Sequence, residues 1–201
     1  MKYNGPKVRL SRALGLALTP KAARIMEKRP YPPGQQGPNR RRRRPSGYKE
    51  QLVEKQRLRA QYNVHERQMK TYFKRSMQKK GNTADNLVAM LETRLDAVVL
   101  RGGFARSIYA ARQYVGHGHF EVNGRKVDVP SYRVRPGDLV RVRPSSQKIL
   151  CFRDAIQSST GHPDYLSVDI DKMTIQFERM PERSEVPVIC DLSKVIEFYS
   201  R

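Results

Sequence analysis

The spacing of apolar residues changes once along this chain, and that change limits the folds that it can form. Residues 48–63 are mostly good helix formers, and between residues 64 and 117 apolar side chains recur every three or four positions, which is typical of amphipathic helices. After Gly118 they alternate with polar side chains, which is typical of strands with one buried face. Helices followed by alternating strands predict an α+β fold in which two helices pack on an antiparallel sheet.

Glycines and capping residues divide the helical part into segments. Gly81 ends one helical pattern, Asn82 is a suitable N-cap for the next, and a break is expected near Thr93. The Gly102–Gly103 pair stops that pattern, and Ser107 can cap a further helix. The segments expected to be helical are 48–63, 64–80, 82–99, 108–115 and 191–199. We expect the last of them to dock onto the earlier helices.

Turn residues divide the alternating part into two predicted hairpins. Asn123–Gly124 is the strongest short hairpin signal in the sequence, and Asp171–Lys172 marks a second turn. A Pro136–Gly137 turn separates the first hairpin from a further strand. The segments expected to be strands are 120–122, 127–129, 140–142, 166–170 and 173–177.

The positive charge of the chain is concentrated toward its start. The formal net charge is +21, and residues 1–80 hold 23 Lys and Arg against 4 Asp and Glu, whereas residues 81–201 hold 17 against 15. Lys and Arg neutralise phosphates and release condensed counterions, so a segment of this kind binds nucleic acid. The sequence therefore predicts a polycationic end joined to an ordinary globular part.

The first 46 residues combine prolines with arginines. Seven prolines, with glycines among them, exclude a long helix or a central strand, so we expect an extended arm with one short helix around Thr19–Lys28. The run Arg40–Arg44 repels itself unless phosphates lie between its side chains. Because the arm has little apolar surface to offset its ordering entropy, we expect it to become ordered only on a nucleic acid.

The residues do not favour a catalytic, metal-binding or membrane protein. Cys151 and Cys190 have no short spacing, which favours a reducing compartment over a disulfide framework. His117 and His119 form a His-x-His pair, but no further metal ligand lies at a useful spacing. No membrane span is expected, because no stretch of about 18 apolar residues is present. Neither an enzyme nor a cofactor is expected, since a phosphate-binding loop, a Ser/His/Asp set and a paired-carboxylate cleft are all missing.

A series of short motifs resembles a known RNA-binding module. The motifs that carry the resemblance are Arg94–Val99, Gly103–Ala105, Ala111–Gln113, His117–His119, Val122–Gly124, Pro130–Tyr132 and Pro136–Asp138. They are similar to the module that takes its name from the small-subunit ribosomal protein number four. Tyr31–Gly37, Glu54–Arg59 and Ile196–Ser200 resemble the same ribosomal protein family in the same order. The resemblance therefore covers essentially the whole chain.

The resemblance implies a structural protein of the small ribosomal subunit that binds rRNA and acts in translation. It implies binding to the 5′ domain of small-subunit rRNA at a five-way junction, and nucleation of subunit assembly. It also implies a contact with small-subunit ribosomal protein five that affects decoding accuracy, and a basic face where mRNA enters the subunit. Some members hold zinc through cysteines in the N-terminal arm, but residues 1–46 contain no Cys or His, so a zinc-free form is expected.

We expect three parts and one set of RNA-binding residues. The parts are a basic arm, 1–46, a helical domain, 47–91 with 182–201, and the RNA-binding module, 92–181. The expected RNA-binding residues are Arg40, Arg41, Arg42, Arg43, Arg44, Lys49, Lys55, Arg57, Arg59, Arg94, Arg101, Arg106, Ser107, Arg112, Gln113, His117, His119, Asn123, Arg125, Lys126, Ser131, Tyr132 and Arg133. A guanidinium group can donate two parallel hydrogen bonds to the oxygens of one phosphate. Backbone N–H groups at the start of the 108–115 helix point toward an anion. Tyr132 is expected either to stack on an unpaired base or to fill a half-buried place in the sheet.

Two other kinds of protein use the same module. A pseudouridine synthase carries its catalytic Asp in a sequence resembling Arg94–Asp96, but here that triplet opens the module, where the Asp can serve as a first-turn acid. Residues 144–201 are also too few for a catalytic domain. A ribosome-associated quality-control binder would lack the proline-rich arm and the flanking helices. The sequence is compatible with a cytoplasmic ribosome and with an organellar one.

Overall fold

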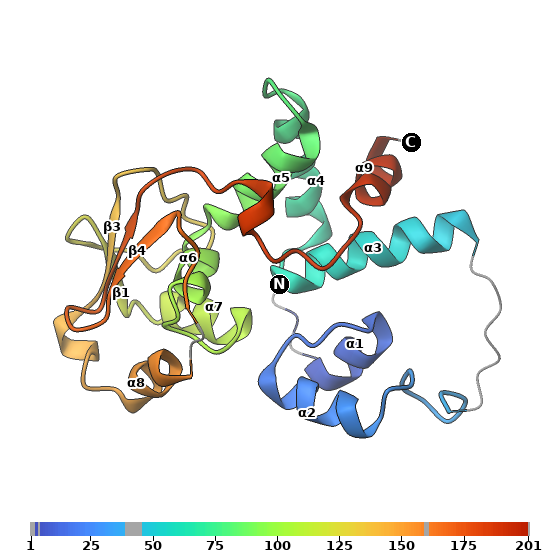
Figure 1. The fold of residues 1–201 in the computed structure, drawn as a ribbon, viewed down its shortest axis with the longest axis horizontal. Helices are drawn as coiled ribbons and strands as arrows, with labels where there is room; N and C mark the ends of the chain where they lie inside the picture. Colours follow the sequence, from blue (N-terminus) through green and yellow to red (C-terminus); the bar gives the residue numbers. More distant parts are fainter. Residues whose placement is uncertain (1–2, 4, 39–45, 159–160, 201) are drawn as a thin grey trace. The chain divides into compact units, whose positions relative to one another are not determined.

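The computed structural model describes residues 3, 5–38, 46–158 and 161–200 (Figure 1). Within these residues the chain forms α-helices and one antiparallel sheet of five strands, which confirms the predicted α+β fold. The chain divides into two compact units, the first formed by Met1–Ala84 with Val188–Arg201 and the second by Asp85–Pro187. The division differs from the expected one, because the start of the chain packs within the first unit and the second unit begins before residue 92.

The first unit contains helices from both ends of the chain. Its helices are α1 (Lys7–Leu14), α2 (Pro20–Lys28), α3 (Gly47–Gln61), α4 (Glu66–Met77) and α9 (Leu192–Ser200), and α5 (Thr83–Glu92) starts in it. α3 and α9 pack against each other, and Gln51 Nε2 donates a hydrogen bond to Glu197 Oε2 at 2.8 Å. Leu58, Phe73 and Val195 are buried in this unit. The prediction that the last helix docks onto the earlier ones is confirmed.

The start of the chain is folded, not extended. Thr19 caps α2 by accepting a hydrogen bond from the Ala22 N–H at 3.2 Å, so the predicted short helix is present. The sequence does not predict α1, because eight residues are too few for a helical period to be recognised. The buried apolar residues here are Leu14, Leu16, Leu18 and Ala22. Since Arg57 of α3 also donates to the Leu14 carbonyl at 2.8 Å, the prediction of an extended arm is wrong for residues 7–18.

The second unit contains the predicted helices and sheet of the RNA-binding module. Its helices are α6 (Leu95–Arg101), α7 (Ile108–Gly116) and α8 (Leu150–Gln157), with 3-10 turns at Pro144–Ser146 and Arg183–Glu185. Its strands are β1 (Phe120–Val122), β2 (Arg125–Lys126), β3 (Leu139–Val142), β4 (Leu166–Asp169) and β5 (Thr174–Phe177). The strand order is β2-β1-β3-β5-β4, and all neighbours are antiparallel. α6 and α7 lie on one side of this sheet (Figure 1).

Both predicted hairpins are present in the sheet. Asn123 has φ 51° and Gly124 has φ 77°, the positive angles that a tight two-residue turn requires. The second hairpin joins β4 to β5, and its turn ends at Met173 with φ 51°. The first hairpin is shorter than predicted, because β2 ends at Lys126 and Val129 is exposed. The strand predicted at 127–129 is therefore not formed.

Candidate nucleic-acid interface

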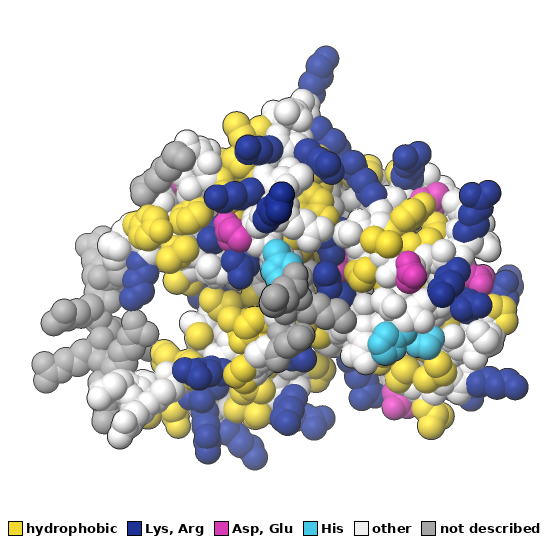
Figure 2. Space-filling model, turned by 180° about the vertical axis from the view of Figure 1, so that it is seen from behind, with side chains coloured by type: hydrophobic (Ala, Val, Ile, Leu, Met, Phe, Trp, Pro, Cys, Tyr) yellow, Lys and Arg dark blue, Asp and Glu magenta, His cyan; other side chains and the backbone are white. Residues whose placement is uncertain are grey.

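Side chains of Lys and Arg are spread over the face drawn in Figure 2, whereas Asp and Glu are few there. In the second unit, Arg106 lies just before α7, is exposed, and donates to the Asp154 carbonyl at 3.0 Å. Ser107 caps α7, and its Oγ accepts from the Ala110 N–H at 3.3 Å. Gln113 is exposed one turn further along. The Ser107 side chain thus serves the helix, and Arg106 and Gln113 are the polar groups presented to solvent.

Two arginines of the second unit face one buried carboxylate. Asp96, in the first turn of α6, is fully buried, and Arg94 donates to it from Nε and Nη2 at 2.9 and 2.6 Å. Arg112 of α7 donates to the same carboxylate from Nη1 at 3.4 Å. Burial raises the pKa of Asp96, and the charges of both arginines act against that rise. Because Arg94 is buried, it is not available to a phosphate in this structure, which corrects its expected role, whereas Arg112 reaches the surface.

A second buried carboxylate holds Arg101. Glu92 is fully buried and accepts hydrogen bonds from Arg101 Nη2 at 2.7 Å and from Arg101 Nε at 3.1 Å. The Tyr165 hydroxyl donates to the same carboxylate at 3.1 Å, and burial, together with the charge of Glu92, raises the pKa of this phenol. Arg101 therefore neutralises a core carboxylate while its side chain stays 16% exposed, and its expected role as a phosphate ligand stays a prediction.

The β1–β2 hairpin presents two exposed cations, Arg125 and Lys126. Asn123 has a different task, because its Nδ2 donates to Asp138 Oδ1 at 2.9 Å and its Oδ1 accepts a backbone N–H from β3 at 2.9 Å. A Cβ at Gly118 would collide with the end of the Lys126 side chain, with Nζ only 3.1 Å away. Because the end of a lysine side chain can move away, the positive φ of 72° at Gly118, just after α7, is the stronger reason for glycine here.

The loop Pro130–Arg133 is attached to the start of α6. The Leu95 N–H donates to the Tyr132 carbonyl at 2.9 Å, and the Asp96 N–H donates to the Pro130 carbonyl at 3.2 Å. In this loop Tyr132 and Arg133 are exposed and Ser131 is half-buried. Arg112 and this loop therefore meet at the same end of α6, the one that carries Asp96.

His117 and His119 follow α7, with ring centroids 6.0 Å apart. His119 Nδ1 lies 2.9 Å from Ser146 Oγ, and the ring is half-buried, whereas His117 is exposed. Burial lowers the pKa of His119, and the neighbouring His117 and Arg143 act in the same direction. Within the part of the chain that the structure describes, no three His, Cys, Asp or Glu side chains are placed to hold a metal ion. Of this pair, His117 is the more exposed residue.

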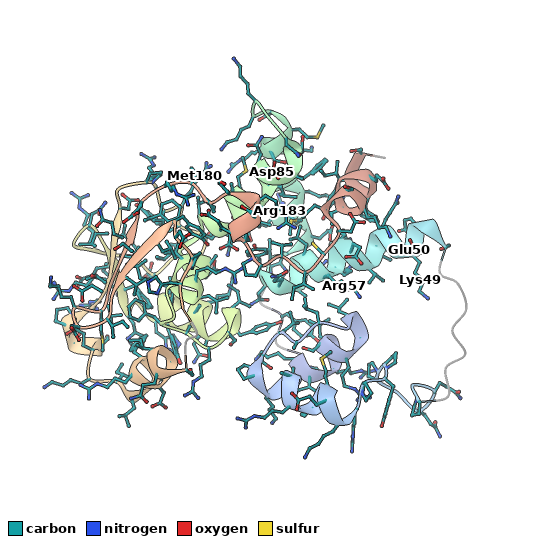
Figure 3. All side chains as sticks on the ribbon, viewed as in Figure 1. Lys49, Glu50, Arg57, Asp85, Met180 and Arg183 are labelled. Atoms are coloured by element: carbon teal, nitrogen blue, oxygen red, sulfur yellow. The ribbon has the colours of Figure 1, made fainter. Side chains whose placement is uncertain are left out.

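The cations expected on α3 have different surroundings. Lys55 and Arg59 both donate to Glu66, each at 3.0 Å. Arg57 donates to a backbone carbonyl of α1 at 2.8 Å. Lys49, which Figure 3 labels together with Arg57, is exposed at the start of the helix. Of these four residues Lys49 is the one placed as a surface cation, and the others hold helices of the first unit together. The run Arg40–Arg44 lies outside the described residues.

A row of cations on α4 was not singled out from the sequence. The exposed basic residues of this helix are Arg67, Lys70, Lys74 and Arg75. They lie opposite the buried Met69 and Phe73, and Glu66 is the only acidic residue in the helix. The signal was available, because the same helical period that places the apolar residues inside places these four outside. With four exposed cations, the α4 row is a basic surface within the first unit.

The arrangement is suited to binding a polyanion and not to catalysis by Asp96 on a nucleobase. The exposed cations of both units have few acidic neighbours, so phosphate oxygens can bind them without displacing internal ion pairs. Asp96 is enclosed and bound by Arg94 and Arg112, and it cannot reach a nucleobase as a catalytic Asp would need to. Among the described residues no helix has the length and apolar character that a membrane span requires.

Comparison with known proteins gives matches along the chain. The family model described as "Ribosomal protein S4/S9 N-terminal domain" matches residues 2–92, and the one described as "S4 domain" matches residues 93–140. The small ribosomal subunit protein uS4 of Streptomyces griseus is 52% identical over 200 residues, which cover 98% of this chain and 97% of that protein. The protein of the same name from Thermobifida fusca is 46% identical over the full length of both chains. This chain therefore belongs to the family of small ribosomal subunit protein uS4.

Proposed function

We propose that this protein is a structural component of the small ribosomal subunit and binds the rRNA of that subunit. The observation that carries the proposal is the match to uS4 proteins at 52% identity over 98% of the chain. The exposed cations of the hairpin, the α7 region and α4 supply the surface that such binding needs. The role is structural and not enzymatic, as it is throughout this family.

Contacts with the RNA backbone should dominate the binding. Among the described residues the exposed tyrosines are Tyr3, Tyr48 and Tyr132, so few rings are available to stack on bases, whereas exposed cations are many. A surface of this kind recognises the shape of a folded RNA more than its sequence. If about 6 to 10 phosphates are contacted, log K should fall against log salt with a slope of roughly −4 to −9.

The finer assignments rest on the family resemblance. We infer that the RNA is the five-way junction of the 5′ domain, and that binding nucleates assembly of the subunit body. A contact with small-subunit ribosomal protein five would connect the chain to decoding accuracy, and its remaining basic surface would lie where mRNA enters the subunit. The match of residues 2–92 to the family's N-terminal domain supports these assignments over a lone quality-control module.

Binding of the full-length protein to defined transcripts tests the proposal. The transcripts are the 5′ and 3′ domains of small-subunit rRNA, a large-subunit fragment of equal length, and tRNA, all at one ionic strength. We expect the 5′ domain to bind at least tenfold more tightly than the other transcripts, and the other transcripts to compete only at low salt. Equal affinity for all four RNAs, or a preference for tRNA or large-subunit rRNA, would contradict the proposal and favour the quality-control alternative.

A further inference from the structure

The buried Asp96 of the second unit has more positive charge around it than it can neutralise. Arg94 binds both of its oxygens, at 2.9 and 2.6 Å, and Arg112 approaches one of them at 3.4 Å. The three side chains together carry one net positive charge. A charge taken out of water is costly unless it is paired and hydrogen-bonded.

The excess charge is directed to the surface by Arg112. Its side chain is 17% exposed, whereas the side chains of Arg94 and Asp96 are 2% and 0% exposed. Arg112 Nε is buried and has no hydrogen-bond partner. The buried Nε does not face solvent, but Asp96 holds the guanidinium through Nη1 alone, and Nη2, which donates to no residue that the structure describes, is left for an incoming anion.

The other buried carboxylate of the unit shows what a closed pair looks like. Glu92 binds Arg101 through two nitrogens, at 2.7 and 3.1 Å, and accepts a third hydrogen bond from Tyr165. All three of these hydrogen bonds end on the one Glu92 carboxylate. The Asp96 centre differs, because a second guanidinium shares the carboxylate and keeps donors unused.

We propose that Asp96 is a positioning residue that holds the Arg112 guanidinium open for one phosphate group of the bound RNA. Arg94 is the structural counter-charge of Asp96, and Arg112 is the residue that touches the phosphate. The inference rests on the proposed RNA binding and names a single site within it. The loop that contains Tyr132 is hydrogen-bonded to the same end of α6, so the phosphate would lie beside an exposed ring.

A double-mutant cycle in the full chain tests whether Asp96 acts through Arg112. The variants are Arg112→Ala, Asp96→Asn and the double substitution, measured for affinity to the 5′ domain of small-subunit rRNA. We expect Arg112→Ala to weaken binding by roughly tenfold or more and to reduce the salt slope by about one. Asp96→Asn should approach the same loss, and the double variant should bind no worse than Arg112→Ala. Independent, additive losses would overturn the proposal.

Glu92→Gln is the matched control for loss of a buried carboxylate. It removes a core negative charge from the same unit without touching Arg112, so it should lower the thermal unfolding temperature but change the affinity of the folded protein by less than about twofold. If Glu92→Gln weakens RNA binding as much as Asp96→Asn, the effect of Asp96 is one of general stability, and the proposal fails.

Arg112→Lys keeps the proposal testable if Asp96→Asn does not fold. A lysine keeps the positive charge but has a single ammonium group in place of the forked guanidinium. If that ammonium binds Asp96, no second donor group remains for the phosphate. We expect Arg112→Lys to lose nearly as much affinity as Arg112→Ala. If Arg112→Lys binds RNA with wild-type affinity, the forked geometry of the Arg112 guanidinium does not matter for binding, and the proposal is contradicted.

Inorganic phosphate separates this inference from the proposed function. Added to wild-type protein at constant ionic strength, it should shift the NMR resonance of the Arg112 Nε–H, and the shift should be absent in Asp96→Asn. A phosphate-dependent shift without preference for small-subunit rRNA would overturn the proposed function and leave the site standing. Preference for that rRNA without any shift at Arg112 would do the reverse.

Discussion

Arginines of the second unit act in the fold or at the surface according to which residues surround them. Arg94 and Arg101 each neutralise a fully buried carboxylate, because an acid in the core requires a paired cation. Arg125 and Arg133 have no such partner inside and are exposed. The sequence suggests all four equally, since nothing in it shows that Arg94, two residues before Asp96, turns back onto that carboxylate. The candidate site was therefore predictable in its region but not in its individual residues.

Glycine at position 102 is required by close packing. A Cβ there would collide with Ile175 of β5, whose Cγ1 would be only 2.8 Å away. Gly102→Ala should therefore destabilise the second unit by about 1 to 3 kcal/mol, the usual cost of overpacking. Thermal unfolding followed by circular dichroism measures the change.

Gly116→Ala is the control for this substitution. Gly116 lies in α7 with no atom within 4 Å of an added Cβ, and alanine is the better helix former. It should leave stability unchanged or raise it by up to about 1 kcal/mol. If both alanine variants have the same unfolding temperature, close approach to β5 does not explain Gly102.

At the scale of elements, length decided what could be predicted. The segments predicted as α3, α4 and α7 are helices, and both hairpins form, because each has a long run of helix formers, a sustained period or a specific turn pair. α1 and α8 were not predicted, since each has eight residues and buries only two side chains. Tertiary packing, not periodicity, stabilises such short helices.

Glu66 joins three helices of the first unit. It accepts hydrogen bonds from Lys55 and Arg59 of α3, each at 3.0 Å, and from Tyr199 of α9 at 2.9 Å. Glu66→Gln should lower the free energy of unfolding at neutral pH by about 1 to 2 kcal/mol, because charge-assisted hydrogen bonds are lost. Denaturant titration measures it. Glu27→Gln, at an exposed position on α2, should stay within about 0.5 kcal/mol of wild type.

The pH dependence of this effect follows from the pKa of Glu66. Burial acts to raise that pKa, but hydrogen bonds from Lys55, Tyr199 and Arg59 outweigh it and lower the pKa below 4.5. A carboxyl group with a lowered folded-state pKa stabilises the fold above its unfolded pKa and loses that contribution as pH falls through the folded value. The stability difference between wild type and Glu66→Gln should therefore be full at neutral pH and shrink below about pH 4.5. A difference that is constant down to pH 3 would contradict the assignment.

The α4 row should bind RNA through charge alone. Lys70 and Lys74 are exposed on the same face of the helix, so replacing both with Gln should leave the unfolding temperature unchanged. Affinity for the 5′ domain should fall, and the salt slope should become shallower by about 1.5, as expected for two lost phosphate contacts. Lys148→Gln with Lys172→Gln removes the same charge from exposed positions of the second unit. An equal change of slope in both pairs would mean that only net charge matters.

For the whole molecule, the uneven charge predicted the class of partner correctly but not the structure of the part that carries it. The prolines and arginines of residues 1–46 led to the expectation of an arm without a core of its own. In the structure, α1 and α2 bury Leu14 and Ala22, and Arg57 of α3 donates a hydrogen bond to the Leu14 carbonyl of α1. Apolar residues two and four positions apart in a basic segment, such as Leu14, Leu16 and Leu18, were enough to attach it.

Removal of residues 1–45 should therefore affect both stability and binding. The deletion takes away 13 Lys and Arg, which should weaken rRNA binding and make the salt slope shallower, and it also uncovers the surface of α3 that contacts α1. We expect a lower unfolding temperature for the truncated chain, measured by calorimetry beside filter binding. Replacing Arg40–Arg44 with Gln separates the two effects, because it should keep the unfolding temperature and reduce the slope by up to about 4. An unchanged unfolding temperature in the truncated chain would mean that α1 and α2 do not stabilise the first unit. A lowered unfolding temperature in the glutamine variant would mean that the charge of Arg40–Arg44, and not helix packing, stabilises the first unit.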